Sequence, residues 1–239
     1  MDVFCIKRKK IPDPLPLILA DFLTLQAIQD ILSGIMDQKT VIDQFARDFE
    51  IYEYDFLVSK WVIEKLPYIF NGNYDSFLKT KLKLSKLLKV DSCSIIFVGS
   101  ACTGFSLSPF KKLREFNEKS DIDIAIVSHY YFDVAWHAMR NIRPFDYSTE
   151  VQDAIKEHAS KFIYWGTIAT DKILGILPFA KEWLHAQEEI SKEPIFENRK
   201  VNFRLYQDHE ALRTYHLRNF KSNLPDILGV KSESIMLKC

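Results

Sequence analysis

Two aspartates set two residues apart inside an apolar run constrain this chain more than any other feature. Asp121 and Asp123 alternate with isoleucines in the segment SDIDIAIVS, which spans residues 120–128. In a β-strand, residues i and i+2 point to the same face, so the two carboxylates would lie side by side. Their repulsion costs free energy unless a cation lies between them. The pattern therefore predicts a strand over residues 121–128 that presents a divalent-cation site. The alternative is that one aspartate caps the strand and the other faces solvent.

A glycine–serine pair lies upstream of these aspartates, where a second apolar segment ends. Residues 94–98 are rich in β-branched side chains and predict a buried strand, which stops at Gly99 and Ser100. Glycine lets a phosphate approach the backbone closely, and the serine hydroxyl can bind a phosphate oxygen. Alone, such a pair is typical of an ordinary turn. Together with two carboxylates, which Mg²⁺ commonly takes along with substrate phosphates, it indicates phosphoryl chemistry.

The two segments together resemble the signature of the DNA polymerase β-like nucleotidyltransferase superfamily. The matching residues are FVGS at 97–100 and SDIDI at 120–124, and the resemblance covers roughly residues 76 to 220. It implies an α+β fold with a mixed sheet and flanking helices, extended here by N-terminal and C-terminal helices. It further implies that Asp121 and Asp123 are catalytic and hold Mg²⁺ or Mn²⁺. Gly99 and Ser100 would cradle the β- and γ-phosphates of a nucleotide.

Two departures from that pattern concern the third carboxylate and the spacing. The superfamily usually supplies another acid from a later strand, but the strand predicted over 201–206, VNFRLY, offers Asn202 and Arg204, which we assign to nucleotide binding. Other acids lie outside predicted strands, at Asp146, Glu150 and Asp208. In addition, 20 residues separate the serine from the first aspartate. This extra segment carries four basic residues and either guides a nucleic acid or triphosphate or is a solvated loop: Lys111, Lys112, Arg114 and Lys119.

The resemblance implies an enzyme that transfers a nucleoside monophosphate from an NTP or dNTP to a hydroxyl on a nucleic acid, a nucleotide or a protein. Compact relatives of this kind occur in bacterial anti-phage and toxin–antitoxin modules, so a separate effector or partner protein is expected. The alternative is a non-catalytic, nucleotide-binding pseudo-nucleotidyltransferase that acts as an antitoxin or partner-binding module. A purely helical adaptor leaves the aspartate pair without a cause.

Helices outnumber strands in the predicted organisation. We expect a helical region over residues 1–75 and a nucleotidyltransferase core over 76–239 that ends in a closing helix. The helix-like spacing of apolar residues predicts helices over 38–49, 53–66, 76–89, 130–141, 150–160, 170–190 and 208–221, after a further helical stretch that begins at residue 17. The lysines of the 76–89 helix form a solvated face or, alternatively, a phosphate-binding surface.

Aromatic and polar residues at 164–172, YWGTIATDK, either line a base pocket or form a helix entry with Thr170 as the N-cap. Three histidines lie on predicted helices without the spacing of metal ligands, and structural roles are expected for them: His137, His158 and His216.

Composition excludes several other classes of protein. Thirty-two basic residues balance 32 acidic ones, so the net charge does not argue for a polyanionic partner. The four cysteines are scattered without a CxxC pair, which disfavours a disulfide framework or zinc site and favours a cytoplasmic location. The apolar stretch LPLILADFLTL is too short and too interrupted to insert in a membrane. The motifs of serine hydrolases, zincins and P-loop NTPases are missing from the sequence.

Overall fold

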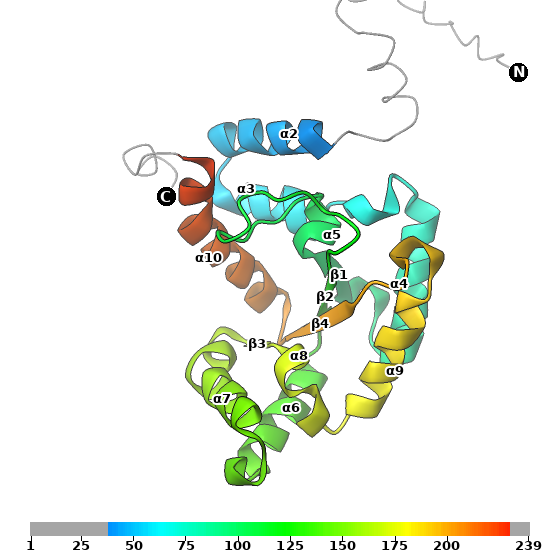
Figure 1. The fold of residues 1–239 in the computed structure, drawn as a ribbon, viewed down its shortest axis with the longest axis vertical. Helices are drawn as coiled ribbons and strands as arrows, with labels where there is room; N and C mark the ends of the chain where they lie inside the picture. Colours follow the sequence, from blue (N-terminus) through cyan, green and yellow to red (C-terminus); the bar gives the residue numbers. More distant parts are fainter. Residues whose placement is uncertain (1–37, 230–239) are drawn as a thin grey trace, which may run out of the picture. The chain divides into compact units, whose positions relative to one another are not determined.

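The computed structural model describes residues 38–229, and this part of the chain is α+β (Figure 1). In chain order, the first elements are α2 (Gln38–Ile51), α3 (Tyr54–Val58), the π-helix η2 (Ser59–Ile63), α4 (Tyr74–Leu88), β1 (Ile95–Val98) and α5 (Gly99–Thr103). They are followed by β2 (Ile122–Val127), α6 (His129–Asn141), α7 (Thr149–Glu157) and the π-helix η6 (His158–Phe162). The last are β3 (Thr167–Ile168), α8 (Thr170–Ile173), α9 (Ala180–Ser191), β4 (Val201–Tyr206) and α10 (His209–Leu228).

Within the described residues the strands form a four-stranded mixed sheet in the order β1-β2-β4-β3. β1 runs antiparallel to β2, β2 runs parallel to β4, and β3 runs antiparallel to β4. The parallel pair is central, and the chain between its two strands contains α6, α7, β3, α8 and α9. Parallel strands need such a long crossover, since a tight turn cannot join them.

The alternation of side chains divides the core between the two faces of the sheet. On one face Phe97, Ile124 and Phe203 are buried in a cluster with residues of α4, α6 and α9. On the other face Val98 and Ala125 are buried against α2, α3, η2 and α10. Asp123 lies two residues before Ala125, so its side chain points to the second face. The polar residues of this face therefore lie between the sheet and the helices that cover it.

A buried carboxylate joins two of the covering helices. Asp48 of α2 is 2 % exposed, and it accepts a hydrogen bond from Trp61 Nε1 at 2.8 Å and pairs with Lys60 Nζ at 2.6 Å. Burial by itself raises the pKa of Asp48, but the bonds from Lys60 and Trp61 outweigh it and hold that pKa below its usual value. Because both partners lie on η2, this network fixes the π-helix that walls the second face of the sheet.

Side-chain caps explain where several helices begin. Asn73, Ser128 and Asp208 each accept a hydrogen bond from the backbone N–H three residues further on, at the starts of α4, α6 and α10. Each such cap stabilises its helix by about 1 kcal/mol. The cap at Asp208 lies two residues after the end of β4 and so fixes the point from which α10 returns across the sheet.

The three predicted strands are confirmed, at 95–98, 122–127 and 201–206. The prediction of one helix over 170–190 is wrong: α8 and a 3₁₀ turn end before Pro178, whose ring cannot continue a helix, and α9 starts at Ala180. Thr170 is not an N-cap either. Ala169 occupies that position, and the Thr170 hydroxyl donates a hydrogen bond to the Phe203 carbonyl at 2.5 Å. Tyr206 alternates with Leu205 and follows Asn202 and Arg204 on the polar side of the VNFRLY pattern, but it is fully buried.

The helical stretch predicted to begin at residue 17 lies outside the described residues as far as residue 37. The residues described all belong to one compact unit, in which α2 and α3 share a core cluster with the sheet. Of the helices described, none combines the length and the apolar character that crossing a bilayer requires.

Candidate functional site

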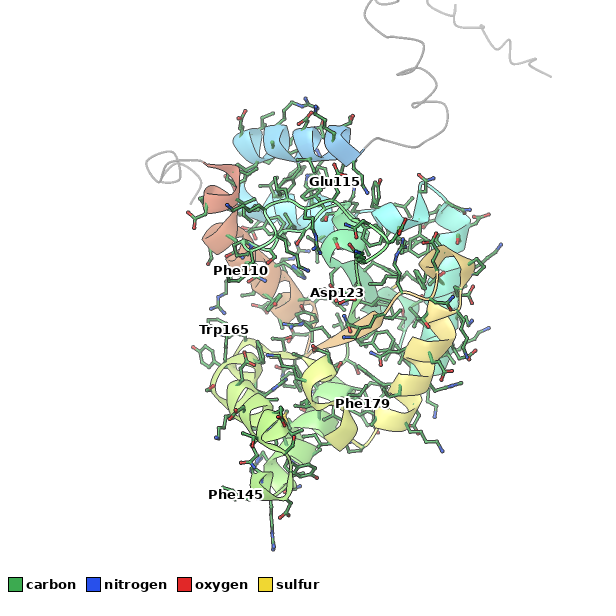
Figure 2. All side chains as sticks on the ribbon, in the orientation of Figure 1. Phe110, Glu115, Asp123, Phe145, Trp165 and Phe179 are labelled. Carbon is green, nitrogen blue, oxygen red and sulfur yellow. The ribbon has the colours of Figure 1, made fainter. Side chains whose placement is uncertain are left out.

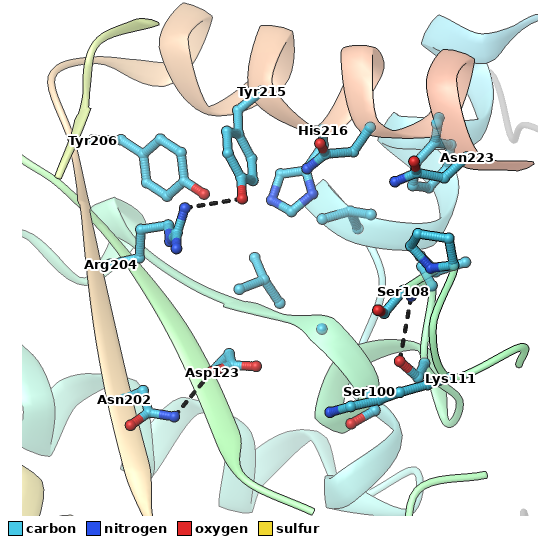
Figure 3. A pocket seen from close by; sticks show the side chains of 18 of the residues that line it. Ser100, Ser108, Lys111, Asp123, Asn202, Arg204, Tyr206, Tyr215, His216 and Asn223 are labelled. Carbon is cyan, nitrogen blue, oxygen red and sulfur yellow. Dashed lines mark hydrogen bonds between the residues drawn. The ribbon is translucent and has the colours of Figure 1, made fainter. Parts of the chain in front are cut away.

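Three segments bring polar groups together at one end of the sheet. Asp123 of β2 is in register with Val98, the last residue of β1, and with Asn202 of β4. Asn202 Nδ2 donates to Asp123 Oδ1 at 3.2 Å and lies 3.5 Å from Asp121 Oδ2. Figure 3 shows Asn202 and Asp123 joined across the two parallel strands. The amide thus links both carboxylates of the predicted pair.

The bend after β1 brings the backbone against the Asp123 carboxylate. Gly99 has a φ of +64°, a conformation that other residues adopt only with strain. A Cβ at this position would lie 2.9 Å from Asp123 Oδ2. Both the dihedral angle and the missing side chain are therefore needed for the glycine bend to meet the aspartate, which explains why the chain places glycine there.

The electrostatic environment of Asp123 is unfavourable to its charge. Burial raises the pKa of this carboxyl; the hydrogen bond from Asn202 opposes the rise, and the negative charge of Asp121 adds to it. Asp121 lies just before β2 and is exposed. The Asp121 and Asp123 carboxylates are neighbours, and keeping Asp123 charged costs free energy. Such a pair is a donor set suited to a hard divalent cation such as Mg²⁺.

The described residues contain no group of three or more histidine, cysteine, aspartate or glutamate side chains that could hold a metal ion. A metal here would therefore take its remaining ligands from the Asn202 amide, from phosphate oxygens or from water. The alternative acids of the sequence do not supply the missing carboxylate, because Asp146, Glu150 and Asp208 are absent from the cavity lining formed by the described residues. Asp208 instead caps α10.

A cavity of ≈ 440 Å³ opens on this face of the sheet. Five of the six residues predicted for the site line it: Gly99, Ser100, Asp123, Asn202 and Arg204. Asp121 does not line it and reaches the site through its contact with Asn202. This volume lies within the range of small-molecule and cofactor sites. Residues predicted from three separate segments are therefore assembled around one hollow.

Two cationic side chains reach the cavity from opposite sides. Lys111 belongs to the basic segment that follows α5, and Arg204 projects from β4. Arg204 Nη1 donates to the Tyr215 hydroxyl at 2.9 Å, and the guanidinium lies 5.1 Å from the centroid of the same ring. Burial alone would lower the pKa of Arg204, but Tyr215, Tyr206 and the nearby aspartates raise it. The guanidinium therefore stays charged and is held in place by α10.

The basic segment after α5 lies beside the site, and both expectations for it, a guiding element and a solvated loop, stay predictions. Its ends meet where Phe105 and Glu115 form a β-bridge. Lys111 lines the cavity, whereas Lys112 and Arg114 are exposed and do not line it. Phe110, next to Lys111 and labelled in Figure 2, is 95 % exposed.

The stretch at 164–172 contributes less to the cavity than a base pocket would. Within it, Asp171 reaches the lining, whereas the Trp165 ring is covered by the Arg218 guanidinium at 3.1 Å. The structural role expected of His158 is confirmed: its Nε2 accepts from the Ala169 N–H at 3.0 Å. His216, by contrast, lines the cavity.

Sequence reasoning missed the wall that α10 contributes. Its residues at the cavity are Tyr215, His216, Asn219, Phe220 and Asn223. The polar members recur at i, i+3 and i+7, which is one face of a helix, but the same pattern is typical of a solvated surface. Nothing in the sequence shows that this face turns toward the sheet.

The comparisons with known proteins add no relative to this description. No protein-family model, curated protein or solved structure matches the chain.

Proposed function

We propose that this protein is a metal-dependent nucleotidyltransferase, which transfers NMP or dNMP from a nucleoside triphosphate to a hydroxyl acceptor. The observation that carries the proposal is the contact set of Asp123. Its carboxylate lies against the Gly99 backbone, bonds to Asn202 on the neighbouring parallel strand, and shares that amide with Asp121. A bend without a side chain beside paired carboxylates suits a polyphosphate and its metal ion.

In the proposed reaction the acceptor oxygen attacks the α-phosphorus. A new P–O bond forms, the bond to the β-phosphate breaks, pyrophosphate leaves, and the acceptor proton passes to water. Mg²⁺ or Mn²⁺ held by Asp121 and Asp123 would neutralise charge on the attacking and leaving oxygens.

The remaining residues of the cavity bind and orient the nucleotide. Ser100 donates its hydroxyl, and the Gly99 backbone its N–H, to the β- and γ-phosphates. Lys111 and Arg204 line the same cavity and balance the charge of the triphosphate. Because the hydrogen bond to Tyr215 already fixes Arg204, binding of a phosphate to this side chain loses little side-chain entropy.

A second candidate function is nucleotide binding without turnover. The residue opposite Asp123 in the parallel register is Asn202, where a third carboxylate would complete a two-metal site. An amide binds a metal more weakly and cannot accept the proton of the attacking hydroxyl. This observation favours a pseudo-nucleotidyltransferase that serves as an antitoxin or partner-binding module. The resemblance to anti-phage and toxin–antitoxin enzymes supports either role in a bacterial cytoplasm.

The test uses the full chain with each labelled NTP and dNTP, in Mg²⁺ or Mn²⁺, and with RNA, DNA, nucleotides or the protein itself as acceptor. Transfer of label with pyrophosphate release supports the enzyme, provided that Asp121→Asn and Asp123→Asn each lower the rate by about a thousandfold. Asp226→Asn, an exposed carboxylate on α10, is the matched control. Tight nucleotide binding without turnover under every condition supports the binding module. No metal-dependent nucleotide binding refutes both.

A further inference from the structure

The α10 side of the cavity carries polar groups that the proposed transfer reaction does not use. His216, Asn219 and Asn223 follow one another at i, i+3 and i+7 and all line the cavity. They belong to the same helix face as the buried Leu212 and therefore point toward the sheet, where they are partly exposed in the cavity. Figure 3 shows His216 and Asn223 on the α10 side of the cavity, opposite Asp123 and Asn202 on the sheet.

These polar groups lack partners within the described residues. His216 Nε2 is fully buried without a hydrogen bond. The Asn219 and Asn223 amides, both half-buried, make no hydrogen bond in the part of the chain described. Leaving a buried polar atom such as His216 Nε2 unpaired costs about 1–3 kcal/mol, so it calls for an explanation; the two amides are instead partly open to the cavity. A ligand whose edge offers both hydrogen-bond donors and acceptors would supply partners for this row of polar residues, His216, Asn219 and Asn223.

The surroundings of the row suit a flat, uncharged ring. Tyr206, Tyr215, Phe220 and Val62 also line the cavity, so aromatic and aliphatic surfaces flank the polar groups. Burial lowers the pKa of His216 to about 4, so its imidazole is neutral at pH 7. Of the charged residues in the lining, Asp123 and Arg204 come from the sheet, Lys111 from the segment after α5 and Asp171 from α8, whereas α10 contributes none. A polyphosphate thus belongs to the sheet side, and a heteroaromatic ring to the α10 side.

From this division we infer that His216, Asn219 and Asn223 form a nucleobase site and that its preferred base is adenine. The inference rests on the proposed function and deepens it, because it names the base of the substrate. A carboxamide matches the donor and acceptor edge of adenine with two hydrogen bonds. Guanine is usually read by a carboxylate that accepts its N1–H and N2–H₂ groups or by a cation at O6 and N7. α10 presents neither kind of group to the cavity within the described residues.

The test measures Mg²⁺-dependent binding to the full chain by calorimetry, with ATP, GTP, CTP, UTP and inorganic tripolyphosphate as probes. Tripolyphosphate has no base, so it reports only on the sheet side of the cavity. ATP should bind about tenfold more tightly than the other three nucleotides. Asn219→Ala and Asn223→Ala should each weaken ATP binding by about tenfold, reduce the preference for adenine, and leave tripolyphosphate binding unchanged. Ser222→Ala, an exposed neighbour on the same helix that does not line the cavity, should change nothing.

The outcomes separate this inference from the proposed function. Equal binding of all four nucleotides, or a preference for another base, overturns the adenine site while the transferase proposal stands. Equal losses for ATP and tripolyphosphate in the asparagine variants also overturn it, because they would reveal a general change in the cavity. If neither ATP nor tripolyphosphate binds, both proposals fail. Circular dichroism and the melting temperature of each variant establish that it is folded.

Discussion

Gly99 and Asp123 lie so close that a side chain on the glycine would collide with the aspartate. The position of an ideal Cβ on Gly99 is 2.9 Å from Asp123 Oδ2, and the φ of the glycine is +64°. The bend after β1 and the central acid of the site therefore form one arrangement, in which a side chain added at Gly99 would force the Asp123 carboxylate to move.

Gly99→Ala should lower the free energy of unfolding and displace the Asp123 carboxylate. The left-handed backbone costs about 1–2 kcal/mol for alanine, and the collision adds to that cost. Two other glycines separate these effects. Among the described residues, Gly229 has a φ of +67° and no atom within 4 Å of an added Cβ, and Gly175 has neither a left-handed φ nor an atom within 4 Å.

Chemical denaturation should therefore rank the three alanine variants by loss of stability as Gly99, then Gly229, then Gly175. Only the variant at Gly99 should also weaken Mg²⁺-dependent triphosphate binding. Equal losses at Gly99 and Gly229 would show that the Asp123 contact carries no energetic weight.

The pH dependence of stability should report the raised pKa of Asp123. A carboxyl whose pKa is higher in the folded than in the unfolded protein binds its proton more tightly when folded. Its contribution to stability is then fully present below the ordinary pKa of 3.8 and is lost as the pH rises through the folded pKa. At neutral pH without metal, Asp123→Asn should therefore melt at a higher temperature than the wild type.

Mg²⁺ should reverse that order. A cation bound between the carboxylates stabilises the folded wild type by mass action but has little to bind in the variant. Melting curves with and without Mg²⁺ at neutral pH test both statements. An Asp123→Asn protein that is less stable than the wild type in the absence of metal contradicts the prediction.

Asn202→Asp should create a stronger cation site. The substitution adds a carboxylate in register with Asp123 and within reach of Asp121, so the site gains a charged ligand. We expect Mg²⁺ or Mn²⁺ to bind about tenfold more tightly, and the metal-free protein to be less stable at neutral pH because three like charges meet. Titration calorimetry and melting curves measure the two effects. Unchanged affinity for metal would show that Asn202 faces no cation.

Lys111→Ala should weaken triphosphate binding and flatten its dependence on salt. This lysine lines the cavity, and a charge-assisted hydrogen bond to phosphate is worth about tenfold in affinity. Its neighbour Lys112 is exposed, does not line the cavity and serves as the matched control. Binding titrations at several ionic strengths distinguish the two lysines. Equal effects of both substitutions would show that the segment acts only through its general surface charge.

The sheet side of the site was predictable because it depends on local patterns. Alternation of acidic and apolar residues fixed the face of Asp123, and the apolar run before Gly99 located the bend to within a residue. The same alternation in VNFRLY assigned Asn202 and Arg204 to one face of the last strand.

The α10 side was not predictable, because it depends on where a helix packs. A histidine and two asparagines at helical spacing look the same in sequence whether they meet solvent or a cavity. The two-residue strand β3 is too short to show any period. The interruption at Pro178 was hidden by apolar residues that kept a helical spacing on both sides of it.

The parallel pairing of β2 with β4 has a consequence for how the protein comes into being on the ribosome. Asp123 and Asn202, which share a hydrogen bond, are 79 residues apart along the chain. The first of them is synthesised long before its partner, and joining the two strands closes a long loop at a cost in chain entropy. A nascent chain that ends before β4 therefore lacks Asn202, Arg204 and the whole α10 side of the cavity, so no ligand of the complete cavity can assist the early stages of its folding.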